Sequence, residues 1–410
     1  MRVIVPEILP WVMPRGEVMR NSPFSAQLPD QCRQLFPDFF PFSVEHEELI
    51  TPQLTRLSAS GLRKINVNKC KTIYSDIDFM KLVMAAVIVI HHAGVFYFIN
   101  GVNICPTGYM MVEFFFYVSG FFMMSKAARI NEDTSKKRIG STTADYVLSK
   151  YKALIPYTLY AVIVGIIASA IIQKMGYRQI IFNIANCWID VLFLQMYGFY
   201  GVIITGVSWY LSAMIIAIMI LFPFCVKFGR NVLPFFTLLS LLIYGFLSMT
   251  CGSLSNPGQW LGLCYKGTLR GIGSMSAGAV IWILVDDYTG LKSSAVVPAG
   301  IGLLMASVIM SFIYTAGQYD FIIAGLEFIG CLLLFMHKDT KEHRIFKTCR
   351  NFSTCLFLSN FYWATNLAAL TNMPDTRKLI LYFICTGVTA LTMHIVVCNL
   401  ILHLGVRRAA

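Results

Sequence analysis

The sequence predicts an all-α integral membrane protein, a bundle of about ten transmembrane helices. Hydrophobic residues make up 57% of the 410 residues and charged residues only 13%, against roughly 25% charged residues in a soluble domain. The apolar residues fall into runs of about 18–22, the length that crosses a hydrocarbon core. A β-barrel would show alternating segments of about ten residues. Helices are therefore the structure that satisfies the backbone in lipid.

Ten apolar runs are long enough to cross a bilayer, and an eleventh stretch, residues 180–204, is interrupted by polar residues and glycines. The ten runs lie at residues 79–99, 108–128, 153–173, 207–226, 232–250, 266–285, 294–314, 319–336, 353–371 and 379–403. If residues 180–204 do not cross and the N-terminus is cytoplasmic, 17 Lys and Arg residues lie at inside loops and six outside. This asymmetry follows the positive-inside rule. We therefore expect both termini in the cytoplasm, with 180–204 re-entrant or interfacial at the outer face.

Residues 1–75 differ from the rest of the chain in composition. The segment is polar and rich in proline, and it lacks the basic start and short apolar run of a signal peptide. We expect a poorly ordered cytoplasmic extension, followed by a transmembrane domain over residues 76–410. The net charge of +12 is explained by basic inside loops, and no basic patch with interleaved aromatics indicates nucleic acid. Cys251 and Cys264 share one loop and are candidates for a disulfide.

The first two predicted spans carry ionisable residues that a lipid-facing helix would avoid. Lys81 and His92 are eleven residues apart, which places them on one helix face, separated by roughly 16 Å of rise. Asp78, just before them, is a candidate N-cap. Glu113 stands beside a run of aromatic residues in the second span, and the following Ser119-Gly120 pair permits close helix contact.

These residues belong to a series of motifs that resembles the membrane-bound acyltransferase family 3. Asp78-x-x-Lys81 with His92-Ala93 opens the series, and it continues with Phe115-Phe116-x-x-Ser119-Gly120-Phe121, Trp209-Tyr210-Leu211-Ser212, and Leu269-Arg270-Gly271 with Gly278. Each motif alone is weak, but four in this order are specific. The resemblance covers residues 76–403, and the sequence departs from it twice. Lys81 stands where the family usually has arginine, and Asn360 stands where many members have histidine.

The resemblance implies transfer of an acyl group, usually acetyl, from cytoplasmic acyl-CoA to a sugar at or beyond the outer face of the cell membrane. The family's essential first-helix arginine and histidine map to Lys81 and His92. We expect acyl-CoA as a co-substrate, a glycan or lipid-linked sugar as the acceptor, membrane lipids as surroundings, and no permanently bound cofactor. No cluster of metal-ligating residues is apparent in the sequence, so we predict no metal site.

Acyl transfer to a hydroxyl needs a base, donors for the oxyanion and cations for the coenzyme. A neutral histidine removes a proton near pH 7, so His92 is the predicted base, oriented by Glu113 from the neighbouring helix. Lys81 is the predicted coenzyme cation, with Arg270 as a second.

Three further residues are assigned to substrate binding. Ser119 is a candidate hydrogen-bond donor to the oxyanion. Trp209 and Tyr210 belong to the motif that opens a helix.

Structural interpretations of the same residues stay open. His92 is also explained as a packing histidine, Lys81 as snorkelling to the inner headgroups, and Glu113 as the ion-pair partner of a cation. Arg270 is also explained as an interface anchor. Trp209 and Tyr210 would fit an aromatic belt, and Ser119 would fit simple packing.

Two other functions compete with O-acylation of a glycan. In a transporter or exporter, Lys81, His92, Glu113 and Arg270 would form a proton or anion relay. No internal repeat supports that function. A third hypothesis keeps acyl transfer but changes the acceptor to an amino group or a small metabolite. The small residues from Gly271 to Gly278 indicate a close-packed helix face in every case.

Overall fold

The computed structural model describes residues 73–96, 98–99, 102–131, 138–199, 203–287, 295–315, 317, 319–337 and 344–403. The extension predicted over residues 1–75 lies outside these ranges except for its last three positions. The first half of the described chain forms α1 (Ser75–Ala93), η2 (Gly108–Met110), α2 (Met111–Asn131), α3 (Ile139–Ile172), α4 (Tyr177–Asn186), α5 (Trp188–Val191) and η3 (Gln195–Tyr197). The second half forms α6 (Trp209–Phe228), η4 (Gly229–Val232), α7 (Leu233–Cys251), α8 (Lys266–Asp287), α9 (Val296–Ile313), α10 (Asp320–Met336), α11 (Arg344–Leu358), α12 (Phe361–Ala368) and α13 (Asp375–His403).

The only described strands, β1 (Phe98–Ile99) and β2 (Val102–Asn103), form a short antiparallel pair after α1. The all-α membrane character predicted from the sequence is therefore confirmed. Within the described ranges, five stretches are long and apolar enough to cross a membrane: Ile139–Ile172, Trp209–Cys251, Lys266–Asp287, Val296–Ile313 and Asp375–Cys398. Ten crossings and cytoplasmic termini stay predictions. The helices outside this set carry charged residues, as α1 and α2 do, or are short, as α10 to α12 are.

Eight of the ten predicted apolar runs each lie along helix, and two do not. The run at 79–99 extends beyond α1, which ends at Ala93, into β1. The run at 353–371 is broken at Ser359-Asn360, where α11 ends and α12 begins. The described part of residues 180–204 contains most of α4 and all of α5 and η3, each too short to span a bilayer. Cys251 and Cys264 are both free thiols, so the candidate disulfide between them is absent from the structure.

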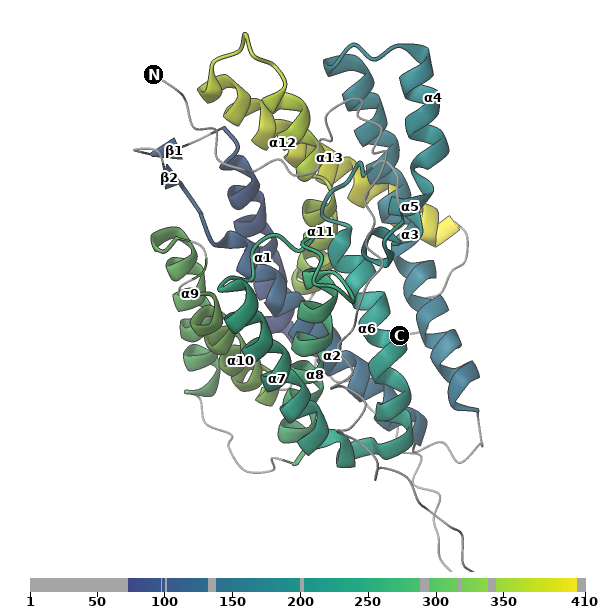
Figure 1. The fold of residues 1–410 in the computed structure, drawn as a ribbon, viewed down its shortest axis with the longest axis vertical. Coiled ribbons are helices and arrows are strands. Elements are labelled where there is room, and N and C mark those ends of the chain that lie inside the picture. Colours follow the sequence, from purple (N-terminus) through teal and green to yellow (C-terminus); the bar gives the residue numbers. More distant parts are fainter. Residues whose placement is uncertain are drawn as a thin grey trace, which may run out of the picture. The chain divides into compact units, whose positions relative to one another are not determined.

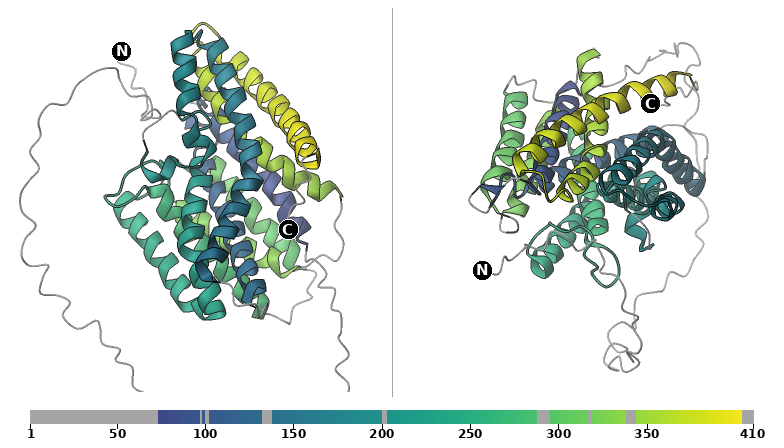
Figure 2. Two further views of the ribbon diagram at one scale, coloured as in Figure 1. Left: turned by 90° about the vertical axis from the view of Figure 1, so that its right-hand side faces the viewer. Right: turned by 90° about the horizontal axis from the view of Figure 1, so that it is seen from above.

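The centre of the bundle is α8, which packs against α2, α6, α7 and α10. Figure 1 shows these helices running in similar directions, with α13 inclined across them. On the opposite side of α2, α1 packs against α11, and α11 packs against α13. Figure 2 shows the long α3 beside α4 at the edge of the bundle. The core is thus built on two helix contacts, α2 with α8 and α1 with α11.

The contact between α2 and α8 depends on glycine at two facing positions. A Cβ added at Gly120 would overlap the backbone carbonyl of Met275, and one added at Gly278 would overlap that of Tyr117. Backbone carbonyls do not move aside as side chains do, so only glycine allows this approach. Of the small residues predicted to pack closely at 271–278, Gly278 makes this contact, while Gly271 lies against Ala213 of α6 and Gly273 against Ile243 of α7. The close packing therefore involves several sides of α8 and not one face.

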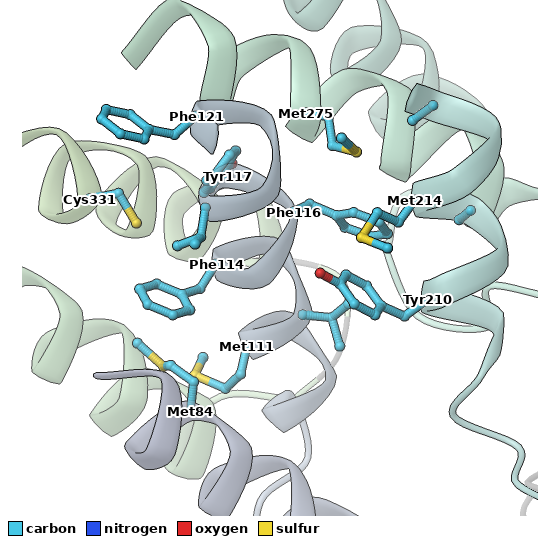
Figure 3. Close-up of a cluster of buried hydrophobic side chains, with 14 of the residues drawn as sticks. Met84, Met111, Phe114, Phe116, Tyr117, Phe121, Tyr210, Met214, Met275 and Cys331 are labelled. Carbon is cyan, nitrogen blue, oxygen red and sulfur yellow. The ribbon is translucent and has the colours of Figure 1, made fainter. Parts of the chain in front are cut away.

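Large side chains fill the space on either side of this glycine contact. Figure 3 shows α2 sending Phe114 and Phe121 toward α10, and Phe116 toward Tyr210 and Met214 of α6. The Phe116 and Tyr210 rings lie 4.6 Å apart, and Phe121 stacks on Phe335 of α10 at 3.6 Å. Every one of these rings is buried. Helix α2 is therefore held from two sides.

The loop between α3 and α6 is organised by Asp190 of α5. Its Oδ2 accepts the backbone N–H groups of Ile204 at 2.7 Å and Thr205 at 3.0 Å, while Oδ1 accepts the hydroxyl of Ser208 at 2.9 Å and the amide of Gln195. Burial raises the pKa of Asp190 above its usual value, although these hydrogen bonds oppose the rise. One buried carboxyl thus fixes the backbone just before α6.

Candidate active site

Helix α1 carries Lys81 in its second turn and His92 in its last turn, eleven residues apart. The helix is continuous between them, so the predicted rise of about 16 Å and the shared face hold. Both ends of this face are polar, and apolar residues such as Met84 and Ile88 are buried between them. We call the two positions the Lys81 end and the His92 end.

At the Lys81 end, one carboxylate lies between two cations. Lys81 Nζ donates to Asp78 Oδ1 at 2.8 Å, and Arg350 of α11 donates to Asp78 Oδ2 at 3.0 Å. Lys81 Nζ also lies over the Phe122 ring, 5.5 Å from its centroid. The Lys81 side chain is 13% exposed and Asp78 8%. Asp78 thus pairs with two cations from two helices.

Asp78 is therefore not the N-cap that the sequence suggested. The helix begins at Ser75 with Tyr74 as its N-cap, and Asp78 lies inside the first turns as an ion-pair partner. Arg350 is one of the 17 basic residues that the topology prediction places at inside loops, and the sequence does not single it out as a site residue. Its position in an amphipathic segment, α11, is the signal that distinguishes it from a loop cation.

At the His92 end, the imidazole contacts aromatic rings and a buried amide. The His92 and Phe361 rings lie 5.4 Å apart, edge to face, and the His91 ring lies at the same distance on another side. Asn360, which directly precedes Phe361, is fully buried beside His92. Within the described residues, His92 Nδ1 is buried without a hydrogen-bond partner, and so is Asn360 Oδ1.

The neighbouring His91 has a different environment. Its Nδ1 lies 2.7 Å from the carbonyl oxygen of Cys105, and its ring lies against Tyr109 at 5.7 Å. A Cβ added at Gly108 would come within 2.7 Å of the His91 Cβ. His91 thus anchors the chain between β2 and α2, on a different side of α1 from Lys81 and His92.

Glu113 does not reach His92 in the structure. The Glu113 Oε1 accepts the Arg270 Nε–H at 2.7 Å, and Oε2 accepts the hydroxyls of Tyr244 at 3.1 Å and of Ser274. The orientation of His92 by Glu113, expected from the sequence, is replaced by a buried ion pair across the α2–α8 contact. The physical reason is the direction of α2, which turns Glu113 toward α8 and away from α1.

Arg270 is also enclosed. It is 0% exposed, and besides Glu113 it donates to the Leu254 carbonyl at 2.7 Å and lies over the Trp209 ring at 5.2 Å. Lys81 lies over Phe122, nine residues along α2 from Glu113, which is about 14 Å of rise. The structure therefore does not bring Arg270 and Lys81 together as a pair of coenzyme cations.

Ser119 and Tyr210 bind each other. The Ser119 hydroxyl lies 3.0 Å from the Tyr210 hydroxyl, which donates to the Phe115 carbonyl at 3.1 Å. The Tyr210 ring lies 5.7 Å from Phe357, in the last turn of α11. Phe357 is three residues before Asn360, so this pair is connected to the His92 end through α11.

Helices α1 and α11 run in the same direction, because two contacts join them in the same order along both segments. Asp78, near the start of α1, contacts Arg350 in the middle of α11, and His92, in the last turn of α1, lies beside Asn360, just after α11 ends. The two helices thus form one seam with a cationic group at one end and an imidazole–amide pair at the other. No group of three or more metal-ligating side chains was found in the parts of the chain described.

The sequence matches a known family over most of its length. A family model described as an acyltransferase domain, of the acyltransferase 3 type, matches residues 74–398. This span includes every described helix except the final turn of α13 and confirms the resemblance inferred from the motifs. No curated protein and no solved structure matches the chain.

Proposed function

The chain belongs to the acyltransferase 3 family, and on this premise we propose that it transfers an acyl group, most simply acetyl, from cytoplasmic acyl-CoA to a hydroxyl of an extracytoplasmic or lipid-linked glycan. The observation that supports this proposal is the seam of α1 and α11. It separates a cationic group from an imidazole by about 16 Å of helix rise, which suits a long donor with an anionic end and a reactive end.

The Lys81 end is proposed to bind the phosphates of the coenzyme. Lys81 is a compact cation held in place by Asp78, and its ammonium group is the proposed partner of a coenzyme phosphate. The thioester then extends along the seam toward His92. Lysine lacks the bidentate fork of arginine, so the grip on phosphate depends on charge more than on geometry.

The His92 end is proposed to carry the chemistry. The acceptor hydroxyl attacks the thioester carbonyl carbon as His92 takes its proton, and the new ester C–O bond forms as the C–S bond breaks. The thiolate leaves with the bonding electron pair, takes up the proton from the imidazolium, and departs as the free thiol of coenzyme A. A neutral His92 is restored for the next cycle.

The remaining predicted site residues are proposed to act indirectly. Glu113 and Arg270 fix α2 against α8, and Trp209 covers the arginine. Ser119 and Tyr210 shape the acceptor side of the seam through Phe357. A relay through Lys81, His92, Glu113 and Arg270, as a transporter would need, has no support here, because Glu113 and Arg270 are engaged with each other.

Glycan mass spectrometry of a deletion strain tests the proposal. The strain is complemented with the wild-type gene, with His92→Ala, or with a lipid-facing control such as Ile309→Ala. We expect loss of one acyl mass per modified sugar in the deletion and His92→Ala strains, with restoration by the wild type and the control. Unchanged glycans in the deletion strain would contradict glycan acylation, and an acyl group on nitrogen would move the acceptor to an amine.

A further inference from the structure

Asn360 has a side chain whose orientation is fixed by its own helix. Its Nδ2 donates to the carbonyl oxygens of Phe357 at 2.7 Å and Leu356 at 3.3 Å, in the last turn of α11. The flipped amide would point its oxygen at two carbonyl oxygens, which repel it, so the hydrogen-bond network determines the assignment. The Oδ1 atom is thereby directed away from α11, on a residue that is 0% exposed.

The Asn360 amide lies beside the His92 imidazole, and Phe361, the residue after Asn360, has its ring 5.4 Å from the same imidazole. The backbone carbonyl of Ile88, one turn earlier on α1, is a second acceptor near His92. Within the described residues, neither Asn360 Oδ1 nor His92 Nδ1 has a hydrogen-bond partner, and both atoms are buried. Buried polar atoms without partners are costly, and in native proteins each such atom needs an explanation.

The Ile88 carbonyl already has the backbone N–H of His92 as its helical donor, whereas Asn360 Oδ1 has no donor among the described residues. A hydrogen bond between Nδ1 and Oδ1 therefore satisfies both atoms that lack a partner. An amide oxygen only accepts, so the imidazole nitrogen must carry the proton. A neutral imidazole has one N–H, and a proton on Nδ1 leaves the lone pair on Nε2. His92 is partly exposed although its Nδ1 is buried, so Nδ1 is not among the exposed atoms of the residue. Nε2 is then the atom available to a substrate.

We propose, on the basis of the proposed acyl transfer, that Asn360 is a positioning residue: its Oδ1 accepts the Nδ1–H of His92, fixing the tautomer whose Nε2 takes the proton of the acceptor hydroxyl. The hydrogen bond closes when the acceptor fills the site, since catalytic hydrogen bonds often tighten only in the substrate complex. An amide orients the imidazole without adding a negative charge to an apolar site.

The first test reads the tautomer directly and needs no activity. The full-length protein is labelled with ¹⁵N-histidine in nanodiscs, and His92 is assigned from the spectrum lost in His92→Gln. We expect the proton on Nδ1 in the neutral wild-type protein, and a shift toward the Nε2–H tautomer in Asn360→Leu. A wild-type His92 that carries its proton on Nε2 would overturn the proposal, whatever the reaction proves to be.

The second test separates positioning from folding. Asn366 is the matched control, because it is 1% exposed, lies one helix further in the same segment, and has both amide atoms bonded to Tyr362 and Gln173. In proteoliposomes given labelled acetyl-CoA and glycan from the deletion strain, Asn360→Leu should lower kcat about 10²-fold. The KM for acetyl-CoA should stay within about twofold, since the Lys81 end is untouched.

Asn360→His should recover most of kcat, because a ring nitrogen can accept the same N–H. Asn366→Leu should lower the amount of folded protein more than kcat. If Asn360→Leu and Asn366→Leu lose activity equally per folded molecule, or if Asn360→His fails to rescue, the amide only holds the junction of α11 and α12, and the proposal is wrong. If the wild-type protein transfers no acyl group, the proposed function is wrong. The ¹⁵N measurement of the His92 tautomer would still test the positioning role of Asn360.

Discussion

The two groups of buried polar side chains in the bundle differ in how many of their hydrogen bonds are made. In the Glu113–Arg270 group, each carboxylate oxygen has a donor and the guanidinium has acceptors on three sides. In the His92–Asn360 pair, one buried nitrogen and one buried oxygen have no hydrogen-bond partner among the described residues. Polar atoms that already have hydrogen-bond partners are not available to a substrate, whereas polar atoms without partners are.

This difference separates residues that the sequence presents as equivalent. His92 and Glu113 are both ionisable residues near the same end of an apolar span, and both are candidates for function on that ground. The structure assigns Glu113 to a helix contact whose glycines permit no adjustment. It places His92 beside Asn360, whose Oδ1 has no hydrogen-bond donor among the described residues.

The largest expected effect is at His92. A base that removes the acceptor proton contributes about 10²–10⁴-fold in rate, or roughly 3–5 kcal/mol of barrier. His92→Ala should therefore abolish detectable acylation at normal membrane abundance, measured by transfer of labelled acetyl to the glycan. His92→Gln sharpens the comparison, because glutamine keeps a hydrogen-bonding group but takes up no proton at neutral pH. An active His92→Gln enzyme would remove His92 from catalysis.

The second-largest effect is expected on stability, at the Glu113–Arg270 group. Breaking a buried ion pair by removing one partner costs about 3–5 kcal/mol, because the other charge is left uncompensated. Arg270→Met should therefore lower the thermal midpoint of the purified protein strongly, with loss of folded protein in the membrane. The double variant with Glu113→Met should recover part of this loss. If Arg270→Met folds normally and loses only activity, Arg270 belongs to the site after all.

The third effect probes the glycine contact that holds the same group. Gly120→Ala forces a methyl group against the Met275 carbonyl and should destabilise the protein by about 1–3 kcal/mol. Gly245 on α7 is the matched control, since nothing lies within 4 Å of a Cβ added there. Gly245→Ala should be neutral or stabilising by less than about 1 kcal/mol. Equal thermal midpoints for the two variants would show that α2 and α8 are less tightly joined than the structure indicates.

The sequence predicts the elements better than the contacts between them. Eight of the ten apolar runs each lie along helix, because a run of that length has few other structures in lipid, and a ninth, 79–99, is helical as far as Ala93. The tenth run breaks at Ser359-Asn360, where no proline or glycine marks the end of α11. The break depends on the Asn360 side chain bonding to the last carbonyls of α11, a tertiary choice that composition does not reveal.

The same limit applies to the candidate site. The shared face of Lys81 and His92 follows from the 100° step of a helix, so it is predictable from spacing alone. The ion-pair partners that Glu113 and Asp78 have on other helices are not predictable in this way, because 157 positions separate Glu113 from Arg270 and 272 separate Asp78 from Arg350. Arg350 was therefore recognised as a cation but not as a neighbour of Lys81.

The smallest expected effect is at Lys81, at the far end of the seam from the chemistry. If Lys81 grips coenzyme phosphate, Lys81→Met should raise the KM for acetyl-CoA with little change in kcat, because the contact is made equally in the ground and transition states. A hydrogen bond to a charged group contributes about 1.5–3 kcal/mol, so we expect a rise of roughly 10-fold to 100-fold at about 1.4 kcal/mol per tenfold. Lys81→Arg should stay close to wild type, since both residues carry one positive charge and can bond to Asp78. The KM of the wild type should also rise with salt more steeply than that of Lys81→Met, because only the wild type has the full cationic group. If Met at this position gives the wild-type KM, Lys81 serves only to pair with Asp78 and reach the headgroups, and the donor must be held elsewhere along α1 and α11.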